Sequence, residues 1–383
     1  MRENFIDLYA RLTERHEAPE IFHRWLSLIC VSAAIGRNCW VERPWYRIYP
    51  SLYVILVAPT GKCRKGGAMR IAMKFVSRIP ELEVVREKAT PKSLMDCLYM
   101  QGRSREDGCS QAFVYAEEAD NFLSRKAYVG GIYPILTALA DNLEAPIEDR
   151  SHQEGVAQLK NIYLNILAGT TPQWLFRSVP QEAASIGLAS RTIFICQMVG
   201  RRFHDQKEDK ELEKLMMDIL LEIHDLHGKF EMDEKSSRWY DTFYRTPQVV
   251  LAPSEPTMGY YERKHDLFLK LAMLYSAAES NERTIIPKNM YRAQETLNEM
   301  EKFMGMAYCS IGNPVFSWVM SRVIREVTER GWVSYKRLAN LMRNKGEASL
   351  RMLDESLNIL VQGEYLIPEK DQIGLMGYRT KEQ

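Results

Sequence analysis

The sequence has few cysteines, none of them paired in a motif, and almost no net charge. Its 383 residues include seven cysteines, and no two of these form a C-x-x-C pair. Scattered cysteines are typical of free thiols in a reducing compartment, so the pattern argues against a disulfide framework or a zinc site and predicts a cytoplasmic protein. The net charge is only +1, which excludes a strong overall basic field. Any contact with nucleic acid therefore has to come from local patches.

Long apolar runs and targeting patterns are also missing. No apolar run approaches the roughly 20 residues that are needed to cross a bilayer, and residues 1–5 lack the pattern of a signal peptide. We therefore expect no contact with a membrane. The content of 46% hydrophobic and 26% charged residues is that of a globular protein, and the length is enough for two or three domains.

One stretch, residues 53–75, has the pattern of a phosphate-binding loop. Residues 53–57 predict a buried strand, residues 68–75 predict a helix, and a basic turn that contains glycine separates them. Backbone N–H groups of such a loop and of the helix N-terminus point toward an anion, and a lysine adds charge. The residues predicted to contact the phosphates are Pro59, Thr60, Gly61, Lys62, Cys63, Arg64, Lys65, Gly66 and Gly67.

The loop departs from the usual motif, G-x-x-x-x-G-K-[ST]. Ala58 stands at the first glycine, and Lys65 comes one residue late when counted from there. Gly66 follows where a Ser or Thr hydroxyl would normally hold Mg²⁺. A second register, Gly61-Lys62-Cys63, lacks the hydroxyl too. The alternative interpretation is a basic strand-to-helix turn that binds no nucleotide.

Paired acids end a second stretch, residues 111–120. A short apolar strand is followed by Glu117 and Glu118. In a nucleotide site the first acid would hold the Mg²⁺ shell, which makes Glu117 the predicted metal ligand. The second would orient and polarise a water molecule against the γ-phosphate. The alternative is a strand end whose acids face solvent, but the position downstream of a phosphate loop favours catalysis.

Polar residues beside two further strands are candidate γ-phosphate contacts. An apolar strand at 162–168 leads into Thr170 and Thr171, and either threonine would sense the γ-phosphate if the strand lies beside the loop. An ordinary turn is the alternative. Arg191 precedes the next apolar strand and would reach a neighbouring subunit's γ-phosphate as an arginine finger, or else pair with a local carboxylate.

A strongly helical, apolar segment begins at Arg263 and extends to Ala278. Arg263 would contact the nucleotide as a second sensor, or else pair with Glu262 or Asp266. Upstream, the charged residues 201–245 are expected to be helical throughout. His16 and His23 are expected on N-terminal helices and receive no role, because a histidine on a helix face is more often structural than catalytic.

Two regions are candidates for contact with DNA. The polar segment 146–159 predicts a hairpin or loop, and Arg150, His152 and Lys160 make it mildly basic. Residues 312–383 predict three helices and a terminal hairpin, the pattern of a winged helix. Basic residues there are Lys336, Arg337, Arg343, Lys345 and Arg351. Because Asp354 and Glu355 fall on the candidate recognition helix, DNA binding and protein contact both remain open for this region.

Taken together, these motifs resemble those of phage- and plasmid-encoded AAA+ proteins that accompany or fuse to DNA primases, which are distantly similar to minichromosome-maintenance helicases. The matching segments, which lie within about residues 18–300, are Arg64-Lys65-Gly66, Glu117-Glu118-Ala119 with Phe122-Leu123, Thr170-Thr171-Pro172, Gly187-Leu188-Ala189-Ser190-Arg191, and Tyr261-Glu262-Arg263 with Leu269-Lys270-Leu271-Ala272. The resemblance implies an α/β fold with a three-layer P-loop NTPase core, ATP and Mg²⁺ as cofactors, and a ring, hexameric by expectation, with ATP bound between subunits.

The expected organisation has four parts: an N-terminal helical region (1–49), a P-loop AAA+ core (50–200), a helical lid region (201–311) and a winged helix (312–383). The expected function is an ATP-dependent DNA helicase, translocase or helicase loader in phage or mobile-element replication, in the cytoplasm of a bacterial host and with a primase as a candidate partner. One alternative is a nucleotide-binding regulatory or structural subunit with weak or no hydrolysis. Another is a DNA-binding initiator or adaptor with a vestigial loop.

Overall fold

The structure is a computed structural model of the chain. It describes residues 3–86, 91–119, 131–141, 147–149, 157–172, 174–175, 187–205, 208–248, 255–308, 314–343 and 347–380. Three residues expected to contact DNA, Arg150, His152 and Lys345, lie outside these ranges.

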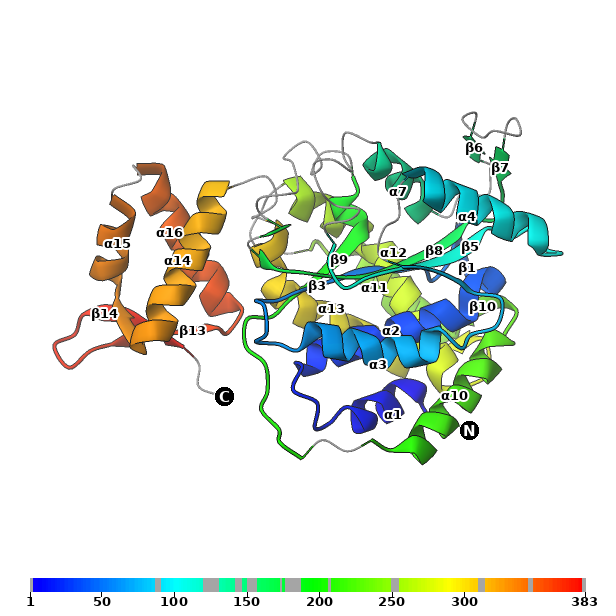
Figure 1. The fold of residues 1–383 in the computed structure, drawn as a ribbon, viewed down its shortest axis with the longest axis horizontal. Helices are drawn as coiled ribbons and strands as arrows, with labels where there is room; N and C mark the ends of the chain where they lie inside the picture. The colour runs from blue at the N-terminus through cyan, green and yellow to red at the C-terminus, as the bar shows by residue number, and fades with distance from the viewer. Residues whose placement is uncertain are drawn as a thin grey trace.

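A five-stranded parallel sheet lies at the centre of the fold, with the strand order β4-β5-β8-β3-β9 (Figure 1). Its strands are β3 (Tyr53–Val57), β4 (Glu83–Arg86), β5 (Gln111–Ala116), β8 (Tyr163–Thr170) and β9 (Thr192–Cys196), and all their pairings are parallel. Four of them, β3, β5, β8 and β9, are buried along their whole length, as expected of strands covered on both faces. The apolar runs that predicted strands are confirmed, and the class is α/β.

Helices cover both faces of this sheet (Figure 1). On one face lie α2 (Glu20–Ile35) and α3 (Lys65–Val76), which pack on each other and on β3 and β8. On the other face lie α4 (Pro91–Ser104), against β5, and α7 (Ile132–Ala140), against β8. Nearly every side chain of α2 is buried, because this helix is covered by the sheet, by α3 and by the N-terminal α1 (Phe5–Leu12).

A second, smaller sheet joins distant parts of the chain in the order β11-β10-β1-β2. The sequence of residues 40–43 and 46–49 predicts a short hairpin, which is confirmed as β1 (Cys39–Glu42) and β2 (Arg47–Ile48). The expectation of helix throughout 201–245 is wrong, because β10 (Gly228–Met232) separates α10 (Lys210–His224) from α11 (Glu234–Arg245). The helix α10 ends at His224, Gly228 begins the strand with a φ of 115°, and Phe230 is buried in the sheet. The remaining strand is β11 (Thr284–Ile285).

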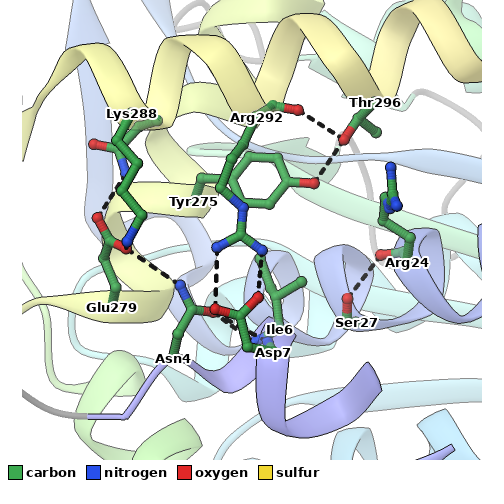
Figure 2. A network of polar contacts seen from close by, with 11 residues as sticks. Asn4, Ile6, Asp7, Arg24, Ser27, Tyr275, Glu279, Lys288, Arg292 and Thr296 are labelled. Carbon is green, nitrogen blue, oxygen red and sulfur yellow. Dashed lines mark hydrogen bonds and ion pairs between the residues drawn. The ribbon is translucent and has the colours of Figure 1, made fainter. Parts of the chain in front are cut away.

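The N-terminal helix is joined to α12 (Glu255–Glu279) and α13 (Pro287–Tyr308) by polar contacts, which Figure 2 shows. The side chain of Asn4 caps α1 by accepting hydrogen bonds from the backbone N–H groups of residues 6 and 7. Its amide donates to Glu279, which also pairs with Lys288. Arg292 of α13 pairs with Asp7 at 2.6 Å. The first helix is therefore part of the same packed body as the lid region.

The C-terminal residues form three helices and an antiparallel sheet, as expected. The helices are α14 (Pro314–Arg330), α15 (Tyr335–Arg343) and α16 (Glu347–Gln362), and the strands β12 (Trp332–Ser334), β13 (Leu366–Lys370) and β14 (Met376–Thr380) pair in the order β12-β14-β13. The sequence predicts Ser334 as the cap of the second of these helices, and its hydroxyl accepts from the N–H of Arg337, which confirms this cap. We call residues 314–380 the C-terminal module.

Smaller elements complete the part of the chain that the structure describes. The polar segment after α7 contains an antiparallel pair, β6 (Ile147–Asp149) and β7 (Ala157–Leu159), in agreement with the hairpin that was one of its two expected forms. Short 3₁₀ turns, η1 (Gly36–Asn38) and η2 (Ala189–Arg191), precede β1 and β9. Within the described ranges, no helix combines the length and apolar character that crossing a bilayer requires.

A buried ion pair between α12 and α13 gives a test of this packing. Lys264 and Glu301 are 6% and 9% exposed and lie 2.8 Å apart, and the hydroxyl of Tyr260 also donates to Glu301. We predict that Glu301→Ala lowers the free energy of unfolding by about 3–5 kcal/mol, because it leaves the ammonium group buried without its partner. Urea denaturation measures the loss.

The exposed pair Arg245–Asp241 within α11 is the matched control. Asp241→Ala should cost no more than about 0.5 kcal/mol, since exposed pairs on a helix contribute little. Similar losses of unfolding free energy in the two variants would show that the Lys264–Glu301 pair is open to water.

Candidate functional site

The predicted phosphate-binding residues lie at the carboxyl edge of the central sheet, between β3 and β8. After β3 the chain passes through α3 to β4 at one border of the sheet, whereas after β8 it crosses to β9 at the other border. Adjacent strands whose connections leave in opposite directions create a crevice outside their carboxyl ends, where open α/β sheets bind ligands. The loop of residues 58–64 and the end of β8 border this crevice, since the N–H of Ala58 donates to the carbonyl of Thr170.

The loop leads directly into the N-terminus of α3. Gly61 and Arg64 both have positive φ angles, 75° and 44°. The left-handed conformation is uncommon for arginine and persists where the surroundings hold it, here through a 2.7 Å ion pair with Glu17. None of the described side chains caps α3, so the N–H groups of its first residues, 65–67, have no partner within the helix. They are available to an anion.

Lys65 extends along the end of β8. Its Cε atom would lie 3.3 Å from a Cβ atom built on Gly169, and the carbonyl oxygen of Glu117 would lie only 2.6 Å from the same point. The close approach of these three segments therefore requires glycine at 169. Lys65 is half-buried and forms no hydrogen bond or ion pair with a residue that the structure describes. This leaves a lysine ammonium beside uncapped helix amides.

The two threonines at the tip of β8 differ in their surroundings. Thr170 is buried beside the loop, so the strand tip lies where the sequence placed it. The hydroxyl of Thr171 accepts from the N–H of Trp174 at 3.2 Å, which is the pattern of a helical N-cap. The hydroxyl of Thr171 is therefore engaged locally, as the turn interpretation expects.

Glu117 follows β5 and lies beside the start of α3. Nη1 of Arg70 donates to both of its carboxylate oxygens at 3.0 and 3.1 Å, and the hydroxyl of Tyr115 donates at 3.1 Å. Burial and the adjacent Glu117 raise the pKa of Tyr115, which keeps its hydroxyl a donor. Arg70 is 64% exposed, so its pair with Glu117 adds no more than about 1 kcal/mol to stability and can exchange for a ligand. Glu118 is exposed.

The residues at this edge do not fit the Mg²⁺ ion that the resemblance implies. Gly66 has no hydroxyl, and a Cβ atom at this position would lie 3.3 Å from Oε2 of Glu117 and 3.5 Å from Nη1 of Arg70. The place of the usual Ser or Thr ligand is therefore taken by the ion pair. Among the described residues, no group of three His, Cys, Asp or Glu side chains comes together in a way that could hold a metal.

The two arginines expected at the γ-phosphate, Arg191 and Arg263, lie at the opposite edge of the sheet. Arg191 precedes Thr192, which pairs with Tyr53, the first residue of β3. Within one chain, neither arginine is brought to the loop. Both donate instead to Asp141 at the end of α7, Arg191 through two bonds of 2.9 and 2.7 Å and Arg263 through one of 2.9 Å.

The carboxyl group of Asp141 balances this pair of arginines. The partner of Arg263 is Asp141, and not the Glu262 or Asp266 that the sequence suggested. Burial raises the pKa of Asp141, but the hydrogen bonds and charges of the two arginines outweigh burial, and the pKa lies below its ordinary value. Asp141 is thus ionised at neutral pH, and Arg191 has the local carboxylate that was one of its two expected partners.

Sequence reasoning missed the residues that hold the loop from outside. A Cβ atom on Gly200 would lie 2.4 Å from the carbonyl oxygen of Lys62, so the segment after β9 packs directly on the loop. The guanidinium of Arg201 donates to the carbonyl oxygens of Thr13 and His16. A glycine and an arginine after an apolar strand are a signal in retrospect, but their partners lie more than a hundred residues upstream, beyond the reach of local patterns.

Two histidines lie beneath the start of α3. The placement of His16 on a helix is wrong, because it lies in the turn between α1 and α2, while His23 is on α2. Nδ1 of His16 lies 3.1 Å from Nε2 of His23, and Nε2 of His16 would lie 3.2 Å from a Cβ atom on Gly67. Burial lowers the pKa of both, and that of His23 lies well below its usual range because it is almost completely enclosed. This pair is therefore uncharged packing beneath the loop.

A cleft separates the loop from the C-terminal module. The hydroxyl of Tyr365 accepts from the N–H of Met198 at 3.0 Å and is 3.2 Å from the carbonyl oxygen of Cys196, which fixes the module to the end of β9. Basic and apolar side chains line the cleft, among them Lys62, Arg64, Arg202, Arg325, Val199 and Ile324. The lining also includes Glu17 and Glu329, so the cleft combines charges of both signs with apolar surface. The module thus forms a wall that sequence reasoning did not assign to the site.

The buried His23 predicts a loss of stability in mild acid. Its pKa is lower in the folded chain than in the unfolded one, so below about pH 6.5 the unfolded state binds more protons. The free energy of unfolding should fall as the pH drops from 7 to 5. Urea denaturation at a series of pH values should show a smaller dependence in His23→Leu. The exposed His227→Leu is the control and should keep the wild-type slope, and equal slopes in all three proteins would contradict the assignment.

No protein-family model matches the chain, and no curated protein matches it either. The geometry of the carboxyl edge is therefore what supports a function.

Proposed function

We propose that the chain is a P-loop protein of the AAA+ type that binds ATP at the loop between β3 and α3. Within a DNA-replication assembly it would serve as a nucleotide-binding regulatory or structural subunit with weak or no hydrolysis. The observation that carries this proposal is the combination of Lys65 and three uncapped helix amides at the crevice between β3 and β8. Helix amides and a lysine together favour a phosphate group.

The site has room for the rest of a nucleotide. The cleft against the C-terminal module begins at the loop, and its apolar side chains, Val199 and Ile324, offer surface for a base. Its arginines, including Arg202 and Arg325, match the negative charge of a nucleotide. We therefore propose that the triphosphate lies on the amides of α3 while the nucleoside extends toward the module.

Two features favour binding over rapid hydrolysis. Fast phosphoryl transfer in P-loop enzymes uses a Ser or Thr hydroxyl and an acid to hold the metal ion. Here Gly66 supplies no hydroxyl, and Arg70 occupies the carboxylate of Glu117. Glu118 remains exposed to solvent and would be the water-orienting acid if turnover occurs.

An ATP-driven helicase, translocase or helicase loader is the second candidate, favoured by the position of Arg191 and Arg263. In a ring, hexameric by expectation, the loop edge of one chain would face the opposite edge of the next. Both arginines would then approach a neighbour's γ-phosphate in trans, and Asp141 would have to release Arg191 for this contact. The β6–β7 hairpin would be the candidate DNA contact.

We propose a winged-helix fold for the C-terminal module, on the basis of its three helices and hairpin. Its basic residues are partly balanced within the module, since Arg351 pairs with Glu355 and Arg337 lies 3.8 Å from Glu326. The hydroxyl of Tyr335 donates to Asp354. This balance favours contact with a protein, such as a primase, over the adaptor function in which the module alone binds DNA.

Substitution of the loop lysines tests the proposal and its register. Lys65→Ala should weaken ATP binding by about tenfold or more, because it removes a charged donor to the phosphates. Lys62→Ala, which removes an exposed lysine of the same loop, is the matched control and should have a smaller effect. Isothermal titration calorimetry measures both. Loss of binding in Lys62→Ala alone would move the site to the second register, and unchanged binding in both would refute it.

Phosphate release separates the two candidate functions. We expect little release from ATP, with no stimulation by single- or double-stranded DNA, because the metal ligands are incomplete. A malachite-green assay of the wild type measures it, and mass photometry reports ring formation in the same mixtures. DNA-stimulated release that disappears in Arg191→Ala would replace our proposal with the motor.

A further inference from the structure

An arginine lies where a P-loop site holds its metal ion. Nη1 of Arg70 is within 3.1 Å of both carboxylate oxygens of Glu117, the acid expected to face Mg²⁺. Both groups also lie within 3.5 Å of the position that a Cβ atom on Gly66 would take. The guanidinium therefore fills the region between the first turn of α3 and the acid at the end of β5.

We propose that this site binds its triphosphate without a divalent cation, and that Arg70 supplies the positive charge in place of the metal. The inference rests on the proposed function, since it requires a triphosphate at the loop. Beyond the proposed function, the inference specifies which form of the nucleotide binds: the free anion and not its magnesium complex.

The geometry of α3 makes Arg70 suitable for this role. It follows Gly66 by four residues, so the two positions share a face of the helix, and side chains on a helix extend toward its N-terminus. Nη1 is bound to Glu117, whereas Nε and Nη2 make no hydrogen bond to a residue that the structure describes. These N–H groups can donate to phosphate oxygens as a planar fork. An anion at the helix N-terminus would thus meet Lys65 on one side and Arg70 on the other.

The same geometry disfavours Mg²⁺. This ion requires near-octahedral oxygen ligands, commonly one or two carboxylates together with phosphate oxygens and water. Glu117 would have to leave Arg70 to become a ligand, and the displaced guanidinium would stay close enough to repel the dication. A serine at 66 would not restore the usual ligand without movement, because its Cβ atom would lie 3.3 Å from Oε2 of Glu117. Arg70 and Mg²⁺ therefore compete for one carboxylate.

This competition predicts a magnesium effect that differs between the wild type and Arg70→Ala. The probe is ATP carrying a fluorescent N-methylanthraniloyl group, and the readout is its anisotropy on titration with the full-length chain, in excess EDTA or in millimolar MgCl₂. The wild type should bind equally well in EDTA or more tightly there. Arg70→Ala should lose about tenfold in affinity in EDTA, because a charged donor is removed. Its binding should recover in MgCl₂, because Glu117 is then free to hold the ion.

The exposed Arg78, just beyond the end of α3, provides the matched control. Arg78→Ala removes the same charge nearby and should behave as the wild type does, while circular dichroism and urea midpoints show whether each variant folds. Tight binding by the wild type only in MgCl₂, with no loss in Arg70→Ala, would overturn the inference and leave the proposed function intact. Absence of binding in both buffers, by wild type and Lys65→Ala alike, would overturn both.

Discussion

Arg201 makes the contacts on which the loop depends. Its side chain donates to the carbonyl oxygens of Thr13, His16 and Ala18 and to the carboxylate of Glu20, while its own N–H binds the carbonyl of residue 17. These carbonyls belong to the turn between α1 and α2, which has no sheet or helix to satisfy them. One arginine therefore attaches the start of the chain to the segment after β9. The loop before α3 lies against the segment after β9, so contacts from outside the loop help to fix its conformation.

The cationic side chains at the two edges of the central sheet differ in whether they have partners. At the amino edge Arg191 and Arg263 share Asp141, and the ammonium of Lys270 donates to the carbonyl of Ser51, with burial lowering its pKa to about 8. At the carboxyl edge Lys65 has no such partner among the described residues. An anion gains most where a fixed positive charge is not already balanced. This contrast favours the proposed ligand position beside α3 over one at the amino edge.

The sequence was sufficient where local pattern and burial coincide. Runs such as 53–57 predicted the buried strands, Ser334 caps the helix that follows it as expected, and the order of strand, turn and helix is confirmed, although α3 begins at Lys65 and not at residue 68. It failed where tertiary contacts decide. The strand of residues 228–232 pairs with residues near 40 and with residues 284–285, and these distant partners make it a strand. The Arg70–Glu117 pair was equally hidden, because its members are 47 positions apart and each is ordinary alone. Local sequence patterns therefore predict where helices and strands lie, whereas the partners of charged side chains depend on how those helices and strands pack together.

The bond from Tyr365 to the backbone at the end of β9 ties the C-terminal module to the strand that borders the loop. A ligand in the cleft would touch both sides and would favour the docked arrangement over any other. Such coupling is reciprocal in free energy. A macromolecule that draws the module away from Met198 would lower the affinity for the ligand by a certain factor. The ligand would lower the affinity for that macromolecule by the same factor. Through the hydroxyl of Tyr365, a macromolecule that binds the C-terminal module would therefore respond to whether a ligand occupies the loop.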